Sequence, residues 1–189
     1  MTTMTTQDIR YYADGDYWSQ TFETTLFQQR AGATEYDIGS FVACTFVNCT
    51  FTGALQDYVF TDCTFVNCDL SQVRWDNAYW QDCVWDDATR GLPTMAEERE
   101  RLTAVVRQID AEPDLFDMSM WHTVTECGTA YCVGGWLARL FPDAPISWVR
   151  KSWANDEHNR GFALAPNASA HFYKTTAEAL AWLAQYRAA

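Results

Sequence analysis

Few residues of this sequence have the types and spacing that chemistry requires. Cys127 is the best candidate nucleophile, and the bases available to it are His122, His158 and His171. A cysteine just before a helix can have a lowered pKa, because the helix N-terminus favours the thiolate. Such a thiol also needs a base within hydrogen-bond reach and a third group that orients the base. The sequence brings no such set together, so the alternative is that Cys127 packs in the core.

The same cysteine allows two further hypotheses. A metal could be held by His122, Cys127 and Cys132, but their spacing matches neither of the usual paired-ligand motifs. A disulfide or redox pair between Cys127 and Cys132 would have more residues between the cysteines than a thioredoxin-like motif, and a reducing cytosol disfavours it. We therefore expect no catalytic residue, no metal and no cofactor, and we expect both cysteines to pack beneath Trp136.

Motifs of other enzyme classes are absent from the sequence. It contains no phosphate loop, no dinucleotide glycine fingerprint and no serine nucleophile elbow. Asn167-Ala-Ser169 matches a glycosylation sequon, but the first residues lack the basic and apolar regions of a secretory signal. No apolar run approaches the roughly 20 residues of a membrane span. We expect a cytoplasmic protein that does not associate with membranes.

The stretch from Gly39 to Thr89 must organise the rest, because it repeats every five residues. A large apolar residue marks the centre of each unit: Phe41, Phe46, Phe51, Phe60, Phe65, Leu70, Trp75, Trp80 and Trp85. A second, mostly smaller series precedes it by two positions: Gly39, Cys44, Cys49, Tyr58, Cys63, Cys68, Val73, Ala78 and Cys83. This period fits neither a helix nor a strand, but it fits a chain that turns a corner every five residues. Stacked four-sided coils would bury both series.

The repeat resembles the pentapeptide-repeat family, whose motif is a small residue, a polar residue, Leu or Phe, and two variable positions. Residues 44–48, 49–53, 63–67 and 68–72 match it closely. The resemblance implies a right-handed quadrilateral β-helix over 39–89, here a short one. The central tryptophans of the last units depart from the family motif and predict a wider final coil. The fold class we predict is α+β.

The residues before and within the repeat predict two local features. Residues 1–38 are rich in aromatic residues and have a turn signal at Asp14-Gly-Asp16. We expect them to form an N-terminal β cap, as a hairpin over the first coil; an aromatic ligand surface is the alternative. The spacing from Phe51 to Phe60 is nine residues where the period requires ten. This predicts a short side or bulge at 54–57.

Residues 90–189 are predicted to form a small α-helical domain. Helix signals occur over 95–111, 130–141 and 146–153, and from 175 onward. Capping boxes at Thr94 and Thr175 start the first and last of these helices, and Thr129 is the expected cap of the second. The charges at 97–101 are expected to face solvent.

The pattern Cys-Gly-Thr-x-x-Cys-x-x-Gly-Trp, beginning at Cys127, lies within this domain. With the residues around it, roughly 115–140, it resembles a small domain of uncharacterised bacterial and phage proteins. The resemblance implies no activity.

The charge is acidic and uneven. The formal net charge is −12, and residues 1–89 carry −10 of it. Such a surface repels nucleic acid and favours basic partners, although it also simply aids solubility. Some pentapeptide-repeat proteins imitate duplex DNA and bind enzymes such as gyrase, and similar mimicry suits phage proteins that block host defence, anti-CRISPR proteins included.

We therefore predict a non-enzymatic, acidic protein-interaction module that does not bind nucleic acid directly. Its partner would be a protein with a basic surface, such as a nucleic-acid enzyme that a DNA mimic inhibits. The expected contact residues are Asp57, Asp62, Asp69, Asp76, Asp82, Asp86 and Asp87. The alternatives are a small cysteine-dependent enzyme in the helical domain, and a purely structural module that forms a homodimer.

Overall fold

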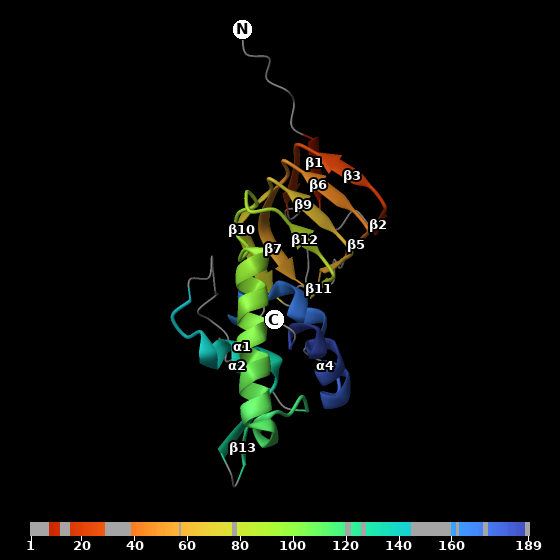
Figure 1. The fold of residues 1–189 in the computed structure, drawn as a ribbon. Coiled ribbons are helices and arrows are strands. Elements are labelled where there is room, and N and C mark those ends of the chain that lie inside the picture. Colours follow the sequence, from red (N-terminus) through yellow and green to blue (C-terminus); the bar gives the residue numbers. More distant parts are fainter. Residues whose placement is uncertain are drawn as a thin grey trace.

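The computed structural model shows short parallel strands stacked into a repeat β-helix, with helices following along the chain (Figure 1). This is an α+β fold. The residues that the structure describes are 8–11, 16–28, 39–56, 58–76, 79–119, 122–125, 128–144, 160–161, 163–171 and 174–187.

The strands of the β-helix form three parallel sheets in this part of the chain. The β10 sheet has the order β1 (Asp8–Tyr11), β4 (Thr25–Gln28), β7 (Thr50–Gln56), β10 (Asp69–Asp76). The β11 sheet has the order β11 (Tyr79–Gln81), β8 (Val59–Thr61), β5 (Ser40–Val42), β2 (Tyr17–Trp18). The β12 sheet has the order β12 (Val84–Trp85), β9 (Thr64–Val66), β6 (Thr45–Val47), β3 (Thr21–Glu23). Strands β7 and β10 are long enough to contain more than one five-residue unit.

The central residues of the units form the core of the β-helix. Phe41 stacks on Phe60 of the next coil with ring centroids 5.1 Å apart, and Phe46 stacks on Phe65 at 4.8 Å. Within one coil, the Phe41 and Phe46 rings meet edge to face. Both contact types are favourable for aromatic rings. The five-residue period therefore produces a continuous column of rings.

The cysteines of the second series are free, buried thiols, as expected if stacked coils bury this series. They are Cys44, Cys49, Cys63, Cys68 and Cys83. Each thiol donates to a carbonyl of the neighbouring coil; Cys63 Sγ, for example, lies 3.2 Å from the Phe41 carbonyl oxygen. These cysteines are small core residues that also satisfy backbone acceptors.

The corners explain why the period is five. Two positions after a central residue, the backbone repeatedly takes a left-handed conformation with φ near 50°. The non-glycine residues with this conformation are Ser19, Thr24, Ala43, Asn48, Asp62, Asn67 and Asp82. Asn and Asp tolerate this region better than most residues, because their side chains hydrogen-bond locally. The backbone conformation therefore favours Asn or Asp at several positions of the repeat, although Ala43 and Thr24 adopt it as well.

The predicted N-terminal hairpin is wrong for the described residues 16–28. Strands β2 and β3 pair in parallel with β5 and β6, and β4 pairs in parallel with β7. The residues Tyr17, Phe22 and Phe27 are five apart, are buried, and stack on the next coil. The same period thus begins earlier in the sequence than Gly39, and these strands extend the β-helix.

The irregular spacing after Phe51 shifts the register between β7 and its partner strand β10. Between the paired positions Asp69↔Thr50 and Gln72↔Thr52, strand β10 has two residues where β7 has one. The register shift therefore lies opposite Phe51 and not at the predicted 54–57. One coil is a residue shorter than the next, and the longer strand absorbs the difference. Asp57 itself lies outside the described residues.

The structure confirms the predicted start of the first helix but not the predicted start of the second. Helix α1 (Met95–Ala111) begins at a Thr94 capping box. The expected start of the second helix is wrong: residues around Thr129 form a hairpin of β13 (His122–Thr125) and β14 (Gly128–Tyr131). Helix α2 (Val133–Leu140) starts only after this hairpin, with Cys132 as its N-cap. The predicted helix over 146–153 falls outside the described residues.

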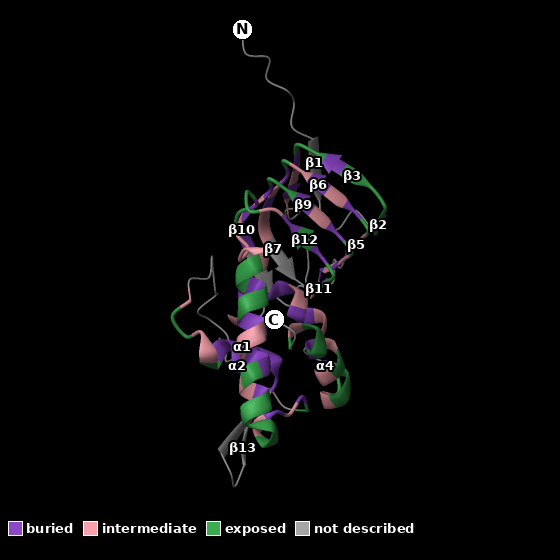
Figure 2. Ribbon diagram, in the orientation of Figure 1, coloured by how far each residue is buried: buried purple, intermediate pink, exposed green. Residues whose placement is uncertain are grey.

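The C-terminal elements complete a second, separate core. After α1 come η2 (Pro113–Leu115) and, beyond α2, η3 (Pro166–His171), α4 (Thr176–Leu183) and η4 (Ala184–Tyr186). The Thr175 capping box of α4 is confirmed. The inner faces of these elements are buried against one another (Figure 2). Gly161 approaches the Gly134 backbone so closely that a Cβ at Gly161 would lie 2.9 Å from the Gly134 Cα, so the glycines permit contact between two chain segments.

Candidate interaction surfaces

The predicted aspartates do not form one uniform face. Asp62 and Asp82 are exposed at successive positions of one corner column, where the Asp62 N–H donates to the Gln81 carbonyl at 2.9 Å. Asp87 is also exposed, in the turn after β12. Asp62 and Asp82 lie just before β9 and β12, and Asp87 lies just after β12. The three residues therefore belong to the two corners on either side of these strands.

An apolar strip lies between these corners. On the outer side of the β12 sheet, Val66 is 36% exposed and Val84 is 48% exposed. Val84 is paired with Thr64, so Val66 and Val84 are diagonal neighbours on this sheet. Outward-facing Val47 continues the column of Val66 on β6, and Thr64 and Thr45 continue the column of Val84. Because both flanking corners carry carboxylates, the strip is rimmed by negative charge.

Two of the predicted aspartates instead hold the chain together. Asp86 Oδ1 accepts hydrogen bonds from the backbone N–H of Asn67 at 2.9 Å and of Thr89 at 3.0 Å. Asp69 accepts from the Ser71 N–H at 3.0 Å and pairs with Arg90. Both carboxyls have a pKa below the ordinary value. For Asp86 the main cause is the Asn67 N–H. For Asp69, burial acts to raise the pKa and is the largest single effect, but the hydrogen bonds from Ser71 and the Arg90 charge together outweigh it.

Two predicted acidic residues are not described. Asp57 lies outside the described residues, and so does the side chain of Asp76. Among the predicted aspartates whose side chains the structure describes, the exposed ones are Asp62, Asp82 and Asp87.

The last coil is closed by side chains that replace a further strand. The Cys83 N–H donates to Asn167 Oδ1 at 2.9 Å, and Asn167 Nδ2 donates to the Cys83 carbonyl at 2.8 Å. The Trp80 N–H donates to Ser169 Oγ at 2.7 Å. Both side chains come from η3, which lies against β11. The open edge of a sheet needs such cover, and here an amide side chain satisfies both polar groups of one residue.

A buried carboxylate of α1 holds this closing segment. Glu98 Oε1 accepts from the Asn167 N–H at 2.7 Å, and Oε2 accepts from Asn167 Nδ2 at 3.2 Å. Glu98 is only 3% exposed. Burial raises its pKa to about 7, although the Asn167 hydrogen bonds and the Arg101 charge act in the opposite direction.

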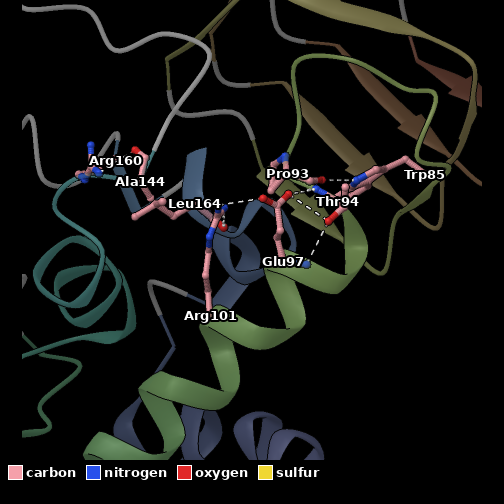
Figure 3. A network of polar contacts seen from close by, with 8 residues as sticks. All are labelled: Trp85, Pro93, Thr94, Glu97, Arg101, Ala144, Arg160 and Leu164. Carbon is pink, nitrogen blue, oxygen red and sulfur yellow. Dashed lines mark hydrogen bonds and ion pairs between the residues drawn. The ribbon is translucent and has the colours of Figure 1, made fainter.

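Neighbouring contacts fix α1 at the base of the β-helix (Figure 3). Trp85 Nε1 donates to the Pro93 carbonyl at 2.6 Å, just before the Thr94 cap. The buried Arg101 donates to the Leu164 carbonyl at 2.9 Å and lies 3.8 Å from Glu97. The expectation that residues 97–101 form a solvated face is therefore wrong for Glu98 and Arg101, which are buried where α1 meets the 163–171 segment.

The candidate thiol site is only partly described. Cys132 is buried and caps α2, with its sulfur 3.5 Å from the Gly135 N–H, and burial raises the pKa of its thiol. His171 stacks on Trp182 with ring centroids 4.1 Å apart. The predicted packing of Cys132 in the core is confirmed. Cys127 and His158 lie outside the described residues, as does the side chain of His122.

Among the described residues, no group of three or more His, Cys, Asp or Glu residues is arranged to hold a metal ion. Over the same residues, no helix has the length and apolar character needed to cross a membrane.

Comparison with known proteins adds no assignment. No family model matches the sequence, and no curated protein matches it.

The residues that close the last coil were missed by sequence reasoning. The sequence marks Asn167 and Ser169 only as parts of a glycosylation sequon, and it places Glu98 among charges expected to face solvent. The sequence does predict that some polar segment covers the end of the β-helix, since the last coil would otherwise have an open edge. The sequence does not say which segment, because Asn167 is far from Cys83 along the chain.

Proposed function

We propose that this protein is a non-enzymatic interaction module of the pentapeptide-repeat type, a right-handed quadrilateral β-helix whose acidic last coils bind a protein with a basic surface. The observation that carries the proposal is the apolar strip at Val66 and Val84, rimmed by the exposed Asp62, Asp82 and Asp87. An apolar centre with a charged rim is the usual organisation of a protein interface. The rim would steer a basic partner and fix its orientation.

The rigidity of the surface also supports the proposal. The strip stands on β9 and β12, whose central residues Phe65 and Trp85 are buried, so its side chains are held in a fixed arrangement. A surface that is already ordered loses little conformational entropy on binding. The separate core formed by α1 and the elements after it supports the further proposal that 90–189 is a distinct domain.

Duplex mimicry is the narrower hypothesis, and the described residues support it less. Asp62 and Asp82 are one coil apart, roughly 4.8 Å from strand spacing. That distance corresponds to about one or two base-pair steps, each about 3.4 Å. An extended mimic of phosphate charge, of the kind that inhibits gyrase or a phage-defence nuclease, would need further acidic residues in line with these corners. A local basic patch on the partner needs no such extension.

The test compares proteins captured from a bacterial lysate by three tagged forms of the chain. One form is wild type, and the second carries Asp62→Asn, Asp82→Asn and Asp87→Asn. The matched control carries Glu112→Gln, Asp114→Asn and Asp143→Asn, which change the charge equally at exposed positions of the helical part. Asn at the two corners keeps the left-handed backbone favourable.

We expect a basic protein that wild type and the control both retain, and that the Asp62, Asp82 and Asp87 variant loses. Its retention should also weaken at high salt, because the charges are exposed. Addition of duplex DNA separates the narrower hypothesis: displacement of the partner supports mimicry of its DNA site. Equal capture by all three forms, or only a homodimer in solution, contradicts the proposal.

A further inference from the structure

The apolar strip on the β12 sheet has a further acid at its far end. Strand β3 is the first strand of this sheet, and Glu23 is the register partner of Val47, which in turn pairs with Val66. Glu23 is exposed, and it precedes the part of the chain in which the sequence predicts acidic contacts. The column of valines therefore ends at a carboxylate as well as running between acidic corners.

The face that carries this strip has no positive charge of its own. Neither the strands β3, β6, β9 and β12 nor the corner residues on either side of them include lysine or arginine. These strands and corners cover residues 19–24, 43–48, 62–67 and 82–87. The carboxylates around the strip are therefore not neutralised by a base of the same face. A complementary partner has an apolar centre with positive charge on both sides of it.

The backbone of this face limits how a partner can bind. Strand β6 is paired with β3 and β9, and β9 is paired with β6 and β12, so both inner strands have a neighbour on each side. Their backbone groups are used within the sheet, and an added strand cannot bind here through main-chain hydrogen bonds. The partner must therefore make its contacts through side chains.

An α-helix has the dimensions that such contacts require. Successive coils are about 4.8 Å apart, and helix residues three or four positions apart rise by about 4.5 or 6 Å. A helix that lies along the stack of coils therefore brings one side chain to each coil. From the coil of Glu23 to that of Val84 is three coil spacings, roughly 14 Å, which corresponds to about ten residues of helix.

We infer that the strip binds an amphipathic α-helix of the partner, which has one apolar edge and lysine or arginine on both sides of that edge. The inference rests on the proposed function and names the element that occupies the same surface. The apolar edge lies on Val47, Val66 and Val84. The basic side chains on its two sides extend toward the corner carboxylates, and a basic residue at one end reaches Glu23.

The probe for this inference is a fluorescently labelled synthetic peptide of about 18 residues, long enough to form a helix on a surface. Leucine stands at every third or fourth position, and lysine stands on both sides of the leucine edge. One control peptide has the same composition in an order that scatters the leucines around the helix. A second control has proline at its centre, which breaks the helix. Fluorescence anisotropy measures the affinity of each peptide for the full chain.

Variants of the chain locate the binding site. Val66→Thr combined with Val84→Thr keeps the β-branched shape and removes apolar contact from the strip. The matched control is Val42→Thr combined with Val59→Thr, because both residues face outward on the neighbouring β11 sheet. Glu23→Gln removes the acid at the end of the strip.

We expect the amphipathic peptide to bind about tenfold or more tightly than either control peptide. Its affinity should fall by about tenfold in the Val66 and Val84 variant, and it should not change in the control variant. Glu23→Gln should weaken binding by about two- to fivefold at low salt and by less at high salt.

Equal binding of the three peptides, or an affinity that the Val66 and Val84 substitutions leave unchanged, overturns the inference. Capture of a basic protein from lysate separates this result from a failure of the proposed function. If capture still depends on the corner aspartates, the proposed function stands and the partner element is not a helix. If capture is also lost, both the proposed function and the inference are wrong.

Discussion

Replacing Asn167 by Ala should weaken the whole closure of the β-helix. The substitution removes the acceptor of the Cys83 N–H, the donor to the Cys83 carbonyl, and one donor to Glu98. A neutral hydrogen bond contributes about 1 kcal/mol net, one to a charged group about 2 kcal/mol, and a buried group left without a partner costs about 1–3 kcal/mol. Because water can enter at this partly buried site and recover some of these bonds, we expect a loss of about 3 kcal/mol.

Urea unfolding followed by circular dichroism measures this loss. With a urea dependence of about 2 kcal/mol per M, the midpoint should fall by roughly 1.5 M. Lys174→Ala, at an exposed residue just beyond η3, should change the stability by less than about 0.5 kcal/mol. Hydrogen exchange at the Cys83 amide should become faster in Asn167→Ala alone. A loss below about 1 kcal/mol, with Cys83 still protected, would refute the argument that this amide replaces a strand.

Two further predictions concern the aspartates of the last coils. Asp62→Val should cost about 1–2 kcal/mol of stability, because a β-branched residue is unfavourable at φ 52°. Asp62→Asn should be within about 0.5 kcal/mol of wild type in thermal unfolding. Equal effects of the two substitutions would mean that the corner conformation imposes no constraint on the residue type. Asp86→Ala should destabilise the protein by about 1–2 kcal/mol at pH 7 through the lost hydrogen bonds of Asn67 and Thr89. Because the pKa of Asp86 is lowered in the fold, the stability that Asp86 contributes disappears as the pH falls through that lowered value. The stabilities of Asp86→Ala and wild type should therefore converge in acid unfolding curves. A difference that persists in strong acid would contradict this prediction.

The aspartates illustrate how an acidic pattern can have several causes. From the sequence, all seven are equivalent members of a charged face. In the structure, Asp62 and Asp82 occupy corners that favour their residue type, and Asp69 and Asp86 accept backbone hydrogen bonds. Charge alone therefore does not identify binding residues, since the backbone conformation also selects Asp at several of these positions.

The sequence determined the β-helix because its information is local and repeated. The inward-facing residues can be identified within each five-residue unit, so the burial of the Phe and Cys series can be predicted without knowledge of any distant contact. The same period was present at Tyr17, Phe22 and Phe27, but three units separated from Phe41 by residues without the repeat motif were too few to indicate a repeat. The capping boxes at Thr94 and Thr175 were equally readable, because each is complete within four residues.

Only the tertiary structure decided how the repeat ends. The groups that close the last coil come from η3, where Asn167 is 84 residues along the chain from Cys83, and Glu98 of α1 holds Asn167 in place. Their residue types are ordinary for a surface, and nothing in their local sequence marks them as buried. Burial and hydrogen-bond partners depend on which segments meet in space, so the sequence fixes the coils through repetition, whereas the closure arises from packing.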